Sequence, residues 1–433
     1  MFKSLRDFVN FYHEKGDVEV LTEKFSVKYD ITRKVLVNHD KKILFFKNIE
    51  GFTLPVLADI LASRERFLAA LEAGKDEEAY LRLMTAMRNP LKLKARSDAP
   101  FLEERSLSLR RLPVPIYFRR DGGPYITSGI VIARDPENDE ILNASIHRLQ
   151  VLDDSTLAIR VVPRHLYNMI EKSWRLGKDL EVGIVIGAPP VALICAACSP
   201  PYGVFEMEVA NRLLDGKLEA TLLPNGLPVP RESEIVIQGR IPRGKFHDEG
   251  PFVDITGTYD VVRKQPVVEV ENVFLRSDAW FHAIVPSGDE HKILMGFERE
   301  ARIWDNVRRV VPYVKGVRLT KGGCGWLHCV ISIKKQSEGD GKNAILAAFA
   351  AHPSLKLVIV VDEDIDIDDP NDVEWALATR FQAGEDLVLI NRVRGSSLDP
   401  SADQESLLTS KMGLDATIPL YKPRDKFEKA TLG

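Results

Sequence analysis

Two acidic residues, Glu249 and Asp254, flank a Gly-Pro pair in a segment whose other residues are strand-like. A turn that brings two carboxylates close to each other and to cations makes them differ in proton affinity, and such differences serve proton transfer. Gly, Pro and Asp are also ordinary turn residues, so the segment taken alone is better explained as a solvated β-turn. A second polar segment, at 143–150, changes that interpretation.

The second segment lies in a predicted strand over 141–151 and holds several polar residues, among them Asn143, Ser145, His147 and Arg148. Side chains alternate along a strand, which puts Asn143, Ser145 and His147 on one face and Arg148 on the other. One site can use both faces only if the strand bends, bulges or meets its ligand end-on. The alternative is a solvent-facing edge strand.

Two further residues that could bind a metal, His165 and Glu206, each open a predicted helix. With Asn143 they form a mixed nitrogen and oxygen donor set suited to Mn²⁺ or Mg²⁺. Their spacing matches no local metal motif, and each taken singly is an ordinary surface or capping residue. The CxxC pair of Cys195 and Cys198 falls in a predicted strand, which favours small core residues over a redox or zinc site.

Three other sequence features remain open or are excluded. The acidic run at 362–369 lacks the glycine and glutamate of an EF-hand loop, and the glycine clusters match no nucleotide fingerprint. A basic run beside the acidic turn could contact a phosphate or form a solvated surface. Its members are Arg240, Arg243, Lys245 and His247.

Composition bounds the class of protein. The chain has 433 residues, 45% hydrophobic and 28% charged, with a net charge of −4. These values are typical of a globular protein of two or three domains and argue against a dedicated nucleic-acid binder. The N-terminus has no signal-peptide pattern, no apolar run has the length of a membrane span, and four cysteines make no disulfide framework. We expect a soluble, cytoplasmic protein.

The hydrophobic pattern changes twice along the chain and predicts three domains. Residues 1–95 alternate helices and short strands, as in an α/β domain. Residues 96–290 contain many short strands separated by Gly, Pro and Asp, which indicates a mainly antiparallel sheet or barrel with inserted helices at 165–175 and 205–214. Residues 291–433 alternate helix and strand, which favours a layered domain with parallel strands. The polar tail, 399–433, is expected to wrap or pack on a neighbour.

Several motifs occur in a specific order. They are N-x-S-I-x-R at 143–148, His165, E-x-E-x-A at 206–210, S-E-I-V-I-x-G at 233–239 and E-G-P-F-x-D-x-x-G at 249–257, followed by segments at 361–366, 375–380, 398–400 and 412–417. This series resembles the UbiD family of prenylated-flavin-dependent decarboxylases over roughly residues 100 to 420.

The resemblance implies an architecture and a reaction. The fold would be an N-terminal α/β domain, a central split β-barrel that binds the flavin, and a C-terminal layered α/β domain with an oligomerisation tail. The reaction would be reversible, non-oxidative decarboxylation of an α,β-unsaturated or aromatic acid, with prenylated FMN as the electron sink. A flavin prenyltransferase would supply the cofactor, and the protein would be a homo-oligomer, either a dimer or a hexamer of dimers.

The resemblance also implies roles for individual residues. Asn143, His165 and Glu206 would bind Mn²⁺ (or Mg²⁺), which also holds the cofactor phosphate. Arg148 would pair with the substrate carboxylate and with Glu249, and Asp254 would donate the proton. The remaining cofactor contacts would be Ser145, Ile146, His147, Arg148, Arg164 and the segment Ala196, Ala197 and Cys198, whose carbonyls would also bind K⁺.

The sequence departs from the common family pattern at His147, Asn211, Gln238 and Val253, which leaves the substrate class open. The short chain looks like the archaeal branch that decarboxylates anhydromevalonate phosphate, an isoprenoid precursor. The alternative substrates are polyprenyl-hydroxybenzoate and small aromatic acids. Outside this reaction class, the alternatives are an ordinary FMN-binding redox protein and a non-catalytic subunit.

Overall fold

The computed structural model describes residues 2–430, which fall into two compact units. The first unit comprises the chain up to Lys75 together with Arg82–Leu294. The second comprises Asp76–Leu81 and the chain from Met295 onward. Helices α4 (Asp76–Arg88) and α8 (Asp289–Val307) contain the points where the chain passes between units. Among the described residues, no helix is both long and apolar enough to cross a membrane.

The first helix of the first unit begins at a side-chain cap. Helix α1 (Leu5–Glu14) has Ser4 as its cap: the Ser4 hydroxyl accepts from the Asp7 amide, and the Asp7 carboxylate accepts from the Ser4 amide. Its apolar face is buried, as the helical spacing of its hydrophobic residues predicts. The other helices of this unit are α2 (Asp30–Leu36), α3 (Arg64–Ala70), α5 (His165–Arg175), α6 (Pro190–Ala196) and α7 (Glu206–Leu213).

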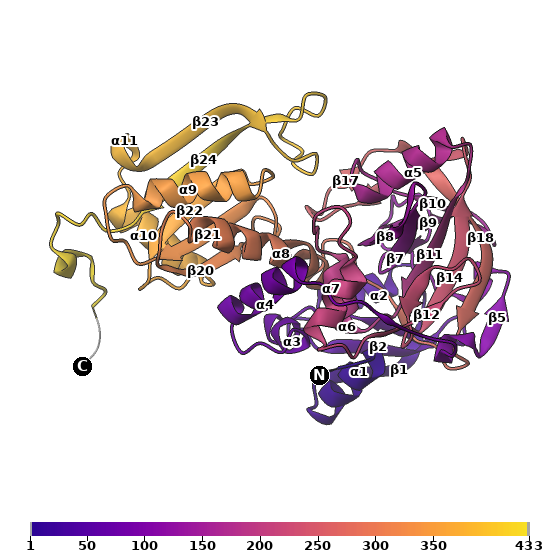
Figure 1. Cartoon of the computed structure of the whole chain (residues 1–433). Helices are drawn as coiled ribbons and strands as arrows, with labels where there is room; N and C mark the ends of the chain where they lie inside the picture. The colour runs from indigo at the N-terminus through magenta and orange to yellow at the C-terminus, as the bar shows by residue number, and fades with distance from the viewer. Residues whose placement is uncertain (1, 431–433) are drawn as a thin grey trace. The chain divides into compact units, whose positions relative to one another are not determined.

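The first unit contains four sheets, of which the largest has ten strands (Figure 1). Its ladders are all antiparallel, as the central region predicts. Its main path runs β6 (Tyr125–Ile126), β9 (Leu149–Val151), β10 (Thr156–Ile159), β18 (Arg263–Leu275), β14 (Ile235–Ile241), β11 (Leu180–Ile186), β7 (Ile130–Asp135) and β8 (Asn138–Ile146), with β5 (Glu104–Ser106) and β15 (Phe246–Glu249) added on β18.

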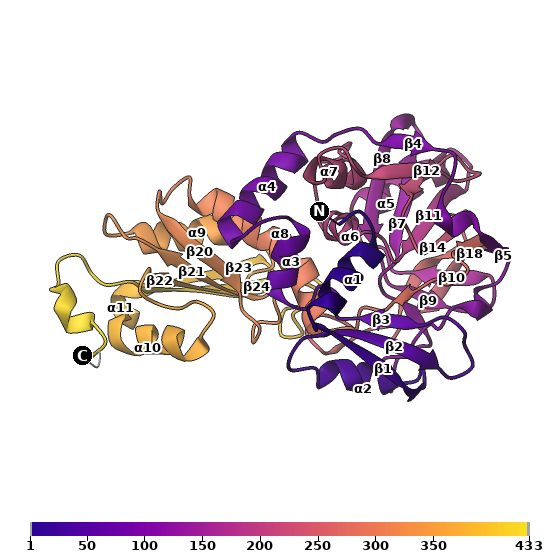
Figure 2. The ribbon, with the colours of Figure 1, turned by 90° about the horizontal axis from the view of Figure 1, so that it is seen from below.

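The ten-stranded sheet is curved but open within the described residues. No ladder joins its two end strands, so the expected split barrel is not a closed ring of hydrogen bonds. Helix α5 packs on this sheet against β7, β8 and β11 (Figures 1 and 2). The smaller sheets are β1 (Val18–Phe25), β2 (Ile43–Ile49), β3 (Val56–Ala58) and β19 (Phe281–His282); β13 (Pro228–Pro230), β12 (Glu219–Leu222) and β4 (Lys94–Arg96); and β16 (Phe252–Val253) with β17 (Tyr259–Asp260).

The predicted single strand over 141–151 is wrong, because the chain breaks between β8 and β9. Strand β8 ends at Ile146 and pairs with β7, whereas β9 begins at Leu149 and pairs with β6. At the break, the His147 amide donates to the Gly129 carbonyl at 3.1 Å. The segments 125–135 and 138–151 therefore form one two-stranded ribbon with a bend in it. After the bend, the β6–β9 pair lies at one end of the strand order and the β7–β8 pair at the other.

The predicted strand over 191–197 is also wrong, because these residues form the helix α6. Pro190 occupies its first turn, where a missing amide hydrogen costs nothing. Cys195 lies in this helix, and Ala197 and Cys198 continue into the turn that follows it. A short apolar run has no period that separates a buried helix from a buried strand.

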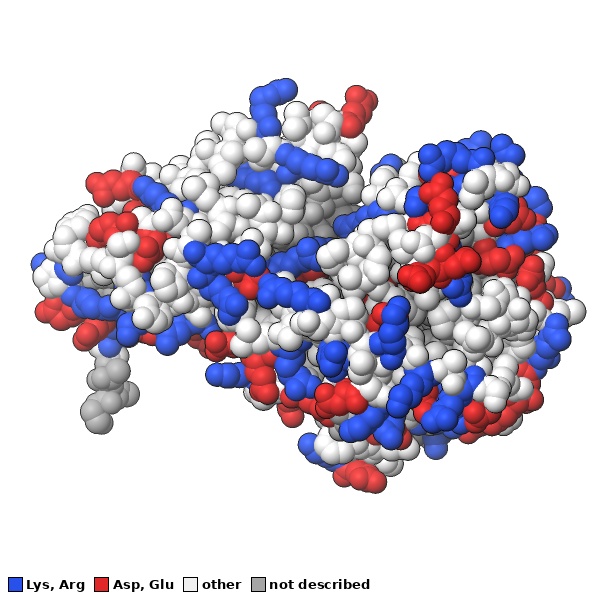
Figure 3. Space-filling view, in the orientation of Figure 1, with Lys and Arg blue, Asp and Glu red and all other residues white. Residues whose placement is uncertain are grey.

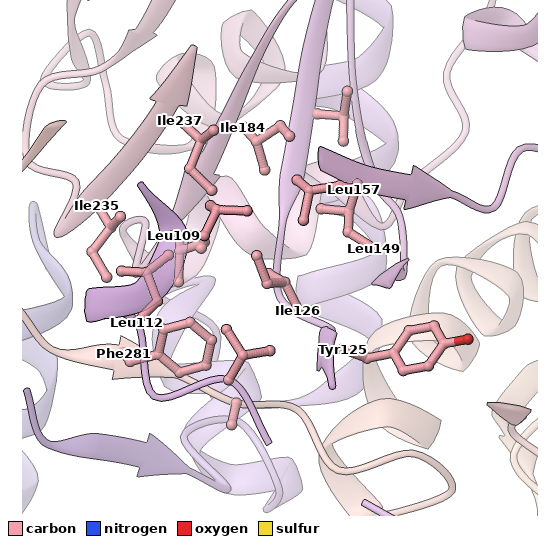
Figure 4. Close-up of a cluster of buried hydrophobic side chains, with 14 of the residues drawn as sticks. Leu109, Leu112, Tyr125, Ile126, Leu149, Leu157, Ile184, Ile235, Ile237 and Phe281 are labelled. Atoms are coloured by element: carbon pink, nitrogen blue, oxygen red, sulfur yellow. The ribbon is translucent and has the colours of Figure 1, made fainter. Parts of the chain in front are cut away.

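The core of the first unit is built from the inner faces of the sheets. Side chains from five separate strands meet in the close-up of Figure 4, among them Ile126, Leu149, Leu157, Ile184 and Ile237, each fully buried. Burial of each such side chain stabilises the fold by about 1.5–3 kcal/mol relative to exposure. This packing holds the ribbon bend, whose ends are Ile126 and Leu149, in a fixed position.

The second unit is a five-stranded sheet with helices packed on it. Its strands, in spatial order, are β20 (Val314–Leu319), β21 (His328–Ile333), β22 (Leu357–Asp362), β24 (Leu408–Ala416) and β23 (Leu387–Arg394). The three central strands are parallel, as predicted, and the two edge strands are antiparallel. Its further helices are α9 (Asp340–Ala351), α10 (Pro370–Arg380) and the short α11 (Ala383–Asp386).

Two features of the second unit depart from the expectations. Strand β24 lies inside the sheet, so this part of the polar tail belongs to its own domain and not to a neighbour. In the acidic run, Asp362 and Asp364 both pair with the buried Arg380, at 3.0 and 2.6 Å. That run is thus tied down by an internal ion-pair network.

Charges of both signs are interspersed over the face shown in Figure 3. This distribution agrees with the near-neutral net charge of −4.

Candidate active site

The centre of the site is an ion pair between Arg148, at the ribbon bend, and Glu249, at the end of β15. The Arg148 Nε donates to Glu249 Oε1 at 2.9 Å and its Nη2 donates to Oε2 at 3.0 Å, a bidentate geometry. The Glu249 side chain is fully buried and that of Arg148 is 9% exposed. Glu249 is therefore no part of a solvated turn.

The second predicted acid contacts the other end of the same guanidinium. The Arg148 Nη1 donates to Asp254 Oδ2 at 3.3 Å, and the Asp254 side chain is 22% exposed. Its backbone is fixed in a tight hairpin, because the Asp254 amide donates to the Thr258 carbonyl and the Gly257 amide donates back to the Asp254 carbonyl. The acid nearer to solvent is thus held by one longer bond, while the buried acid is held by two shorter ones.

Glu249 is fixed by a second layer of polar groups that the sequence did not single out. The Tyr125 hydroxyl, at 3.1 Å from both, contacts Glu249 Oε1 and Gln150 Oε1. Gln150 in turn accepts from the Gly250 amide and donates to the Gly122 carbonyl. Burial and the Glu249 charge raise the pKa of Tyr125, so its hydroxyl stays protonated. These bonds leave Glu249 little freedom to rotate.

Asp260, on β17, is the functional residue that sequence reasoning missed most clearly. Its Oδ2 accepts from Arg148 Nη2 at 3.0 Å, and its side chain is 12% exposed. It lies opposite Phe252 in the β16–β17 ladder, and the Arg148 guanidinium lies over the Phe252 ring at 5.1 Å. Asp260 comes shortly after the motif that contains Asp254. The hairpin between the two residues brings both carboxylates to the same arginine.

Two further titratable groups border the acid pair. Burial lowers the pKa of His291, while the Asp254 charge opposes that change; the Ser287 amide donates to His291 Nδ1 at 3.0 Å. Burial raises the pKa of Asp121 to about 6. Hydrogen bonds from backbone amides, including that of Val253, act in the opposite direction and lower it. The site thus holds groups whose protonation differs near neutral pH, as proton-transfer chemistry requires.

The three residues predicted to share a strand face form a hydrogen-bonded chain. Asn143 Nδ2 donates to Ser145 Oγ at 2.9 Å, and Ser145 Oγ lies 2.9 Å from His147 Nε2. His147 Nδ1 lies 2.8 Å from the Arg160 carbonyl. Burial, with the charges of Arg164 and Arg160, lowers the pKa of His147 to about 4, so the imidazole is neutral. Both of its nitrogens are engaged by the protein.

Glu206 is a buried carboxylate that contacts the backbone of β8 one residue after Asn143. Its Oε2 accepts from the Ala144 amide at 2.7 Å, and the residue is 2% exposed. Burial raises the pKa of Glu206 to about 8. Among the described residues, no Lys or Arg side chain pairs with it. A buried carboxylate without a cationic partner is suited to a divalent cation.

The other predicted cofactor contacts lie on β8 or on the helices that pack against it. His165 opens α5, which packs on β8, and its half-buried ring lies edge-on to Tyr202 at 5.2 Å. Arg164, exposed, donates to Ser199 Oγ at 3.4 Å. Helix α6, which carries Ala196, packs against α7 and β8. Burial, and then the Glu206 charge, raises the pKa of Cys195. Ile146 ends β8 beside the Arg148 bend.

The sequence departures have structural explanations. Val253 is buried and paired with Tyr259, and Asn211 bonds the backbone at Leu91, Lys92 and Leu218. Gln238 contacts Glu271 and Asn272.

The basic run is largely neutralised. Arg240 and Lys245 both pair with the Glu269 carboxylate, and Arg240 also lies 3.5 Å from Asp179. These contacts favour the solvated-surface interpretation of that run over a phosphate site.

Three family models match consecutive parts of the chain. They describe the N-terminal, Rift-related and C-terminal domains of 3-octaprenyl-4-hydroxybenzoate carboxy-lyase, UbiD, and match residues 9–87, 92–289 and 292–416.

Curated relatives match over nearly the whole length. The anhydromevalonate phosphate decarboxylase of Methanothermobacter thermautotrophicus is 43% identical over 98% of this chain and 99% of its own. That of Methanocaldococcus jannaschii is 44% identical over 95% of this chain and 97% of its own.

Solved structures agree with these matches. The UbiD-class enzyme HmfF from Pelotomaculum thermopropionicum, in complex with FMN, superposes with a TM-score of 0.96 at 38% identity, over 99% of this chain and 97% of that one. The apo 3,4-dihydroxybenzoic acid decarboxylase of Klebsiella pneumoniae gives 0.93 at 26% identity, over 100% of this chain and 97% of that one. The protein is a flavin-dependent carboxy-lyase and belongs to the UbiD family.

Proposed function

We propose that the protein catalyses the reversible, non-oxidative decarboxylation of anhydromevalonate phosphate, with prenylated FMN as cofactor. The observation that carries the reaction is Arg148, held between the buried Glu249 and the more exposed Asp254. The substrate follows from the full-length similarity to anhydromevalonate phosphate decarboxylases of two archaea. This assignment places the protein in isoprenoid precursor synthesis.

Arg148 would bind the substrate carboxylate. Of its five N–H groups, four donate to Glu249, Asp254 and Asp260 within the described residues, and one N–H on Nη1 remains. That N–H points from the edge that also contacts Asp254. A carboxylate bound there sits beside the acid that must deliver a proton after CO₂ leaves.

Asp254 would be that proton donor, and Glu249 would hold Arg148. Glu249 is buried with two short bonds to the guanidinium, so it is suited to orientation. Asp254 has one 3.3 Å bond and contact with solvent, so it can exchange protons during the cycle. Prenylated FMN, when bound, would supply the electron sink for the carbanion-like centre.

Asn143, His165 and Glu206 would hold the divalent cation, Mn²⁺ or Mg²⁺, that binds the cofactor phosphate. The buried Glu206 carboxylate supports this role, because a bound cation would compensate its charge. Ser145, Ile146, His147 and Arg164 would line the cofactor. Ala196, Ala197 and Cys198 would offer carbonyl oxygens to K⁺ at the end of α6.

The proposal extends to the domain boundaries, the oligomeric state and the supply of the cofactor. The family models, with boundaries near 90 and 290, support domains at 1–95, 96–290 and 291–433. An evolved dimeric form of HmfF supports a homo-oligomer. A flavin prenyltransferase would act as cofactor supplier in the cytoplasm.

The test is production of the protein together with a flavin prenyltransferase, followed by mass and absorbance measurement of the released cofactor. We expect prenylated FMN, manganese, and turnover of anhydromevalonate phosphate with release of CO₂. Good activity on a hydroxybenzoate, with none on anhydromevalonate phosphate, would replace the substrate but keep the reaction. Unmodified FMN with hydride exchange from a nicotinamide would instead identify an ordinary flavin redox protein.

A further inference from the structure

Asp260 is a carboxylate shared by three arginines. Its Oδ2 lies 3.0 Å from Arg148 Nη2 and 3.6 Å from Arg160 Nε, and its Oδ1 lies 3.3 Å from Arg263 Nη2. The arginines come from three places: the ribbon bend, the end of β10 and the start of β18. Burial alone would raise the pKa of Asp260, but the three guanidinium groups outweigh it and lower the pKa. Asp260 is therefore ionised at neutral pH.

The contact to Asp260 sets the orientation of the Arg148 guanidinium. Nη2 has two N–H groups, one used by Glu249 and the other by Asp260. With both occupied, the guanidinium plane is fixed at one edge by Glu249 and at its corner by Asp260. The Nη1 end is then the only part of the group, within the described residues, with an N–H to offer a substrate.

Asp260 also contributes to the charge around Arg148. Arg148, Arg160 and Arg263 supply three positive charges, and Glu249, Asp254 and Asp260 supply three negative ones. Asp121, whose pKa is raised to about 6, adds a further negative charge above that pH. Removal of the Asp260 charge would therefore make the cluster more positive, which favours the ionised form of a neighbouring carboxyl group over its protonated form.

We propose that Asp260 is a positioning residue for the decarboxylation, which orients Arg148 so that its remaining Nη1 N–H meets the substrate carboxylate beside Asp254. This role rests on the proposed function, because it presumes a carboxylate substrate at Arg148. Asp260 contacts neither the substrate nor the cofactor in this mechanism. It acts through Arg148.

The other charged groups that face Asp254 cannot replace the Asp260 carboxylate. The Arg148 guanidinium is its direct partner, and Glu249 lies on the far side of that group. His291, whose pKa is lowered by burial, is neutral at pH 7. Asp121, with a pKa raised to about 6, carries most of a negative charge at pH 8. All of these groups are unchanged by substitution at Asp260.

The test compares wild-type holoenzyme with Asp260→Asn in two measurements. The first is binding of the saturated analogue 3-methyl-5-phosphooxypentanoate, by calorimetry at pH 8. We expect the variant to bind the analogue within threefold of the wild type, because Arg148 keeps its Nη1 N–H for the carboxylate and the contacts to the phosphate are unchanged. This measurement separates loss of binding from loss of orientation.

The second measurement is the pH profile of kcat and KM. In Asp260→Asn the Arg148 guanidinium loses the charged contact that fixes its corner, so kcat should fall at least tenfold while KM changes less than threefold. The alkaline limb of kcat should move to lower pH by on the order of one unit, the effect of removing one charge a few ångströms away at an effective dielectric of about 20. Asp154→Asn is the matched control, since Asp154 accepts from the exposed Arg110 away from the site.

An unchanged kcat and an unmoved pH profile in Asp260→Asn would overturn the proposal. If that variant loses flavin or unfolds, Asp260→Glu carries the test: it keeps the charge but displaces it, and should keep the wild-type pH profile with a reduced kcat. An undiminished kcat in Asp260→Glu, with flavin retained, would also count against the proposal. A wild type that neither binds the analogue nor turns over the acid refutes the proposed function, and that result is distinct from both.

Discussion

Replacement of Glu249 by Gln tests the centre of the site most directly. The variant keeps the shape of the side chain and an acceptor for one Arg148 N–H, but removes the charge and one of the two parallel bonds, now 2.9 and 3.0 Å long. Loss of one partner from a buried ion pair costs about 3–5 kcal/mol when the other charge is left alone. Arg148 keeps Asp254 and Asp260, so we expect a smaller loss, about 1–3 kcal/mol of unfolding free energy.

The effect on catalysis should exceed the effect on stability. With one anchor weakened, the guanidinium can turn toward Asp260, and a displacement of about 1 Å at a reacting group costs on the order of 10²-fold in rate. We therefore expect kcat to fall about 10²-fold or more, with flavin and metal content unchanged. The assay is CO₂ release at saturating substrate, with unfolding followed by chemical denaturation on the same preparation.

The matched control is Glu219→Gln, which removes a carboxylate from an exposed arginine pair with Arg96. It should change stability by less than about 1 kcal/mol and leave kcat unchanged. Retention of kcat within threefold in Glu249→Gln would refute the idea that Glu249 positions Arg148. A parallel fall in bound flavin would show that Glu249 acts through cofactor binding instead.

Three further outcomes are expected. Asp254→Asn should retain flavin and metal but lose turnover, about 10²–10⁴-fold in kcat, as measured by CO₂ release; full activity would remove Asp254 from the mechanism. Glu206→Gln should lose manganese by elemental analysis while remaining folded, and retention of stoichiometric manganese would place the metal elsewhere. Asp59→Asn should stabilise the protein at pH 8 more than at pH 5, by at most about 4 kcal/mol, as measured by denaturation at both pH values. Burial and the Glu290 charge raise the pKa of Asp59 to about 7, so its ionisation costs stability as pH rises from about 4 through 7. An equal effect at both pH values would contradict that reasoning.

The elements with a clear period or a cap were predictable from the sequence. Helices were expected at 4–15, 165–175 and 370–380, and α1, α5 and α10 lie within about a residue of these bounds. Ser4 caps the first of them, and Pro370 occupies the first turn of the last. Antiparallel pairing in the central region followed from the short strands and their turn residues. The pairing of Arg148 with Glu249 and Asp254 was predicted from the resemblance to a family, and spacing alone could not have supplied it.

The features that could not be predicted depend on contacts between distant segments. The break after Ile146 is set by pairing with β7 and β6, which local alternation does not encode. The helical state of α6 is set by its buried surroundings, since all seven of its residues are buried and an apolar run has no polar face to report its period. Asp260 is recognised only once the β16–β17 hairpin puts it beside Arg148.

The two-residue link at His147 and Arg148 sets the spacing between two parts of the proposed site. Asn143, the proposed metal ligand, lies on β8, and Arg148, the proposed carboxylate ligand, follows it across the link, so the length of one short peptide fixes their separation. Deletion or insertion of a single residue there would reverse the two faces of β9, turning Leu149 out of the apolar core and Gln150 away from Tyr125. Natural variants of this enzyme should therefore vary the residues of the link but keep its length.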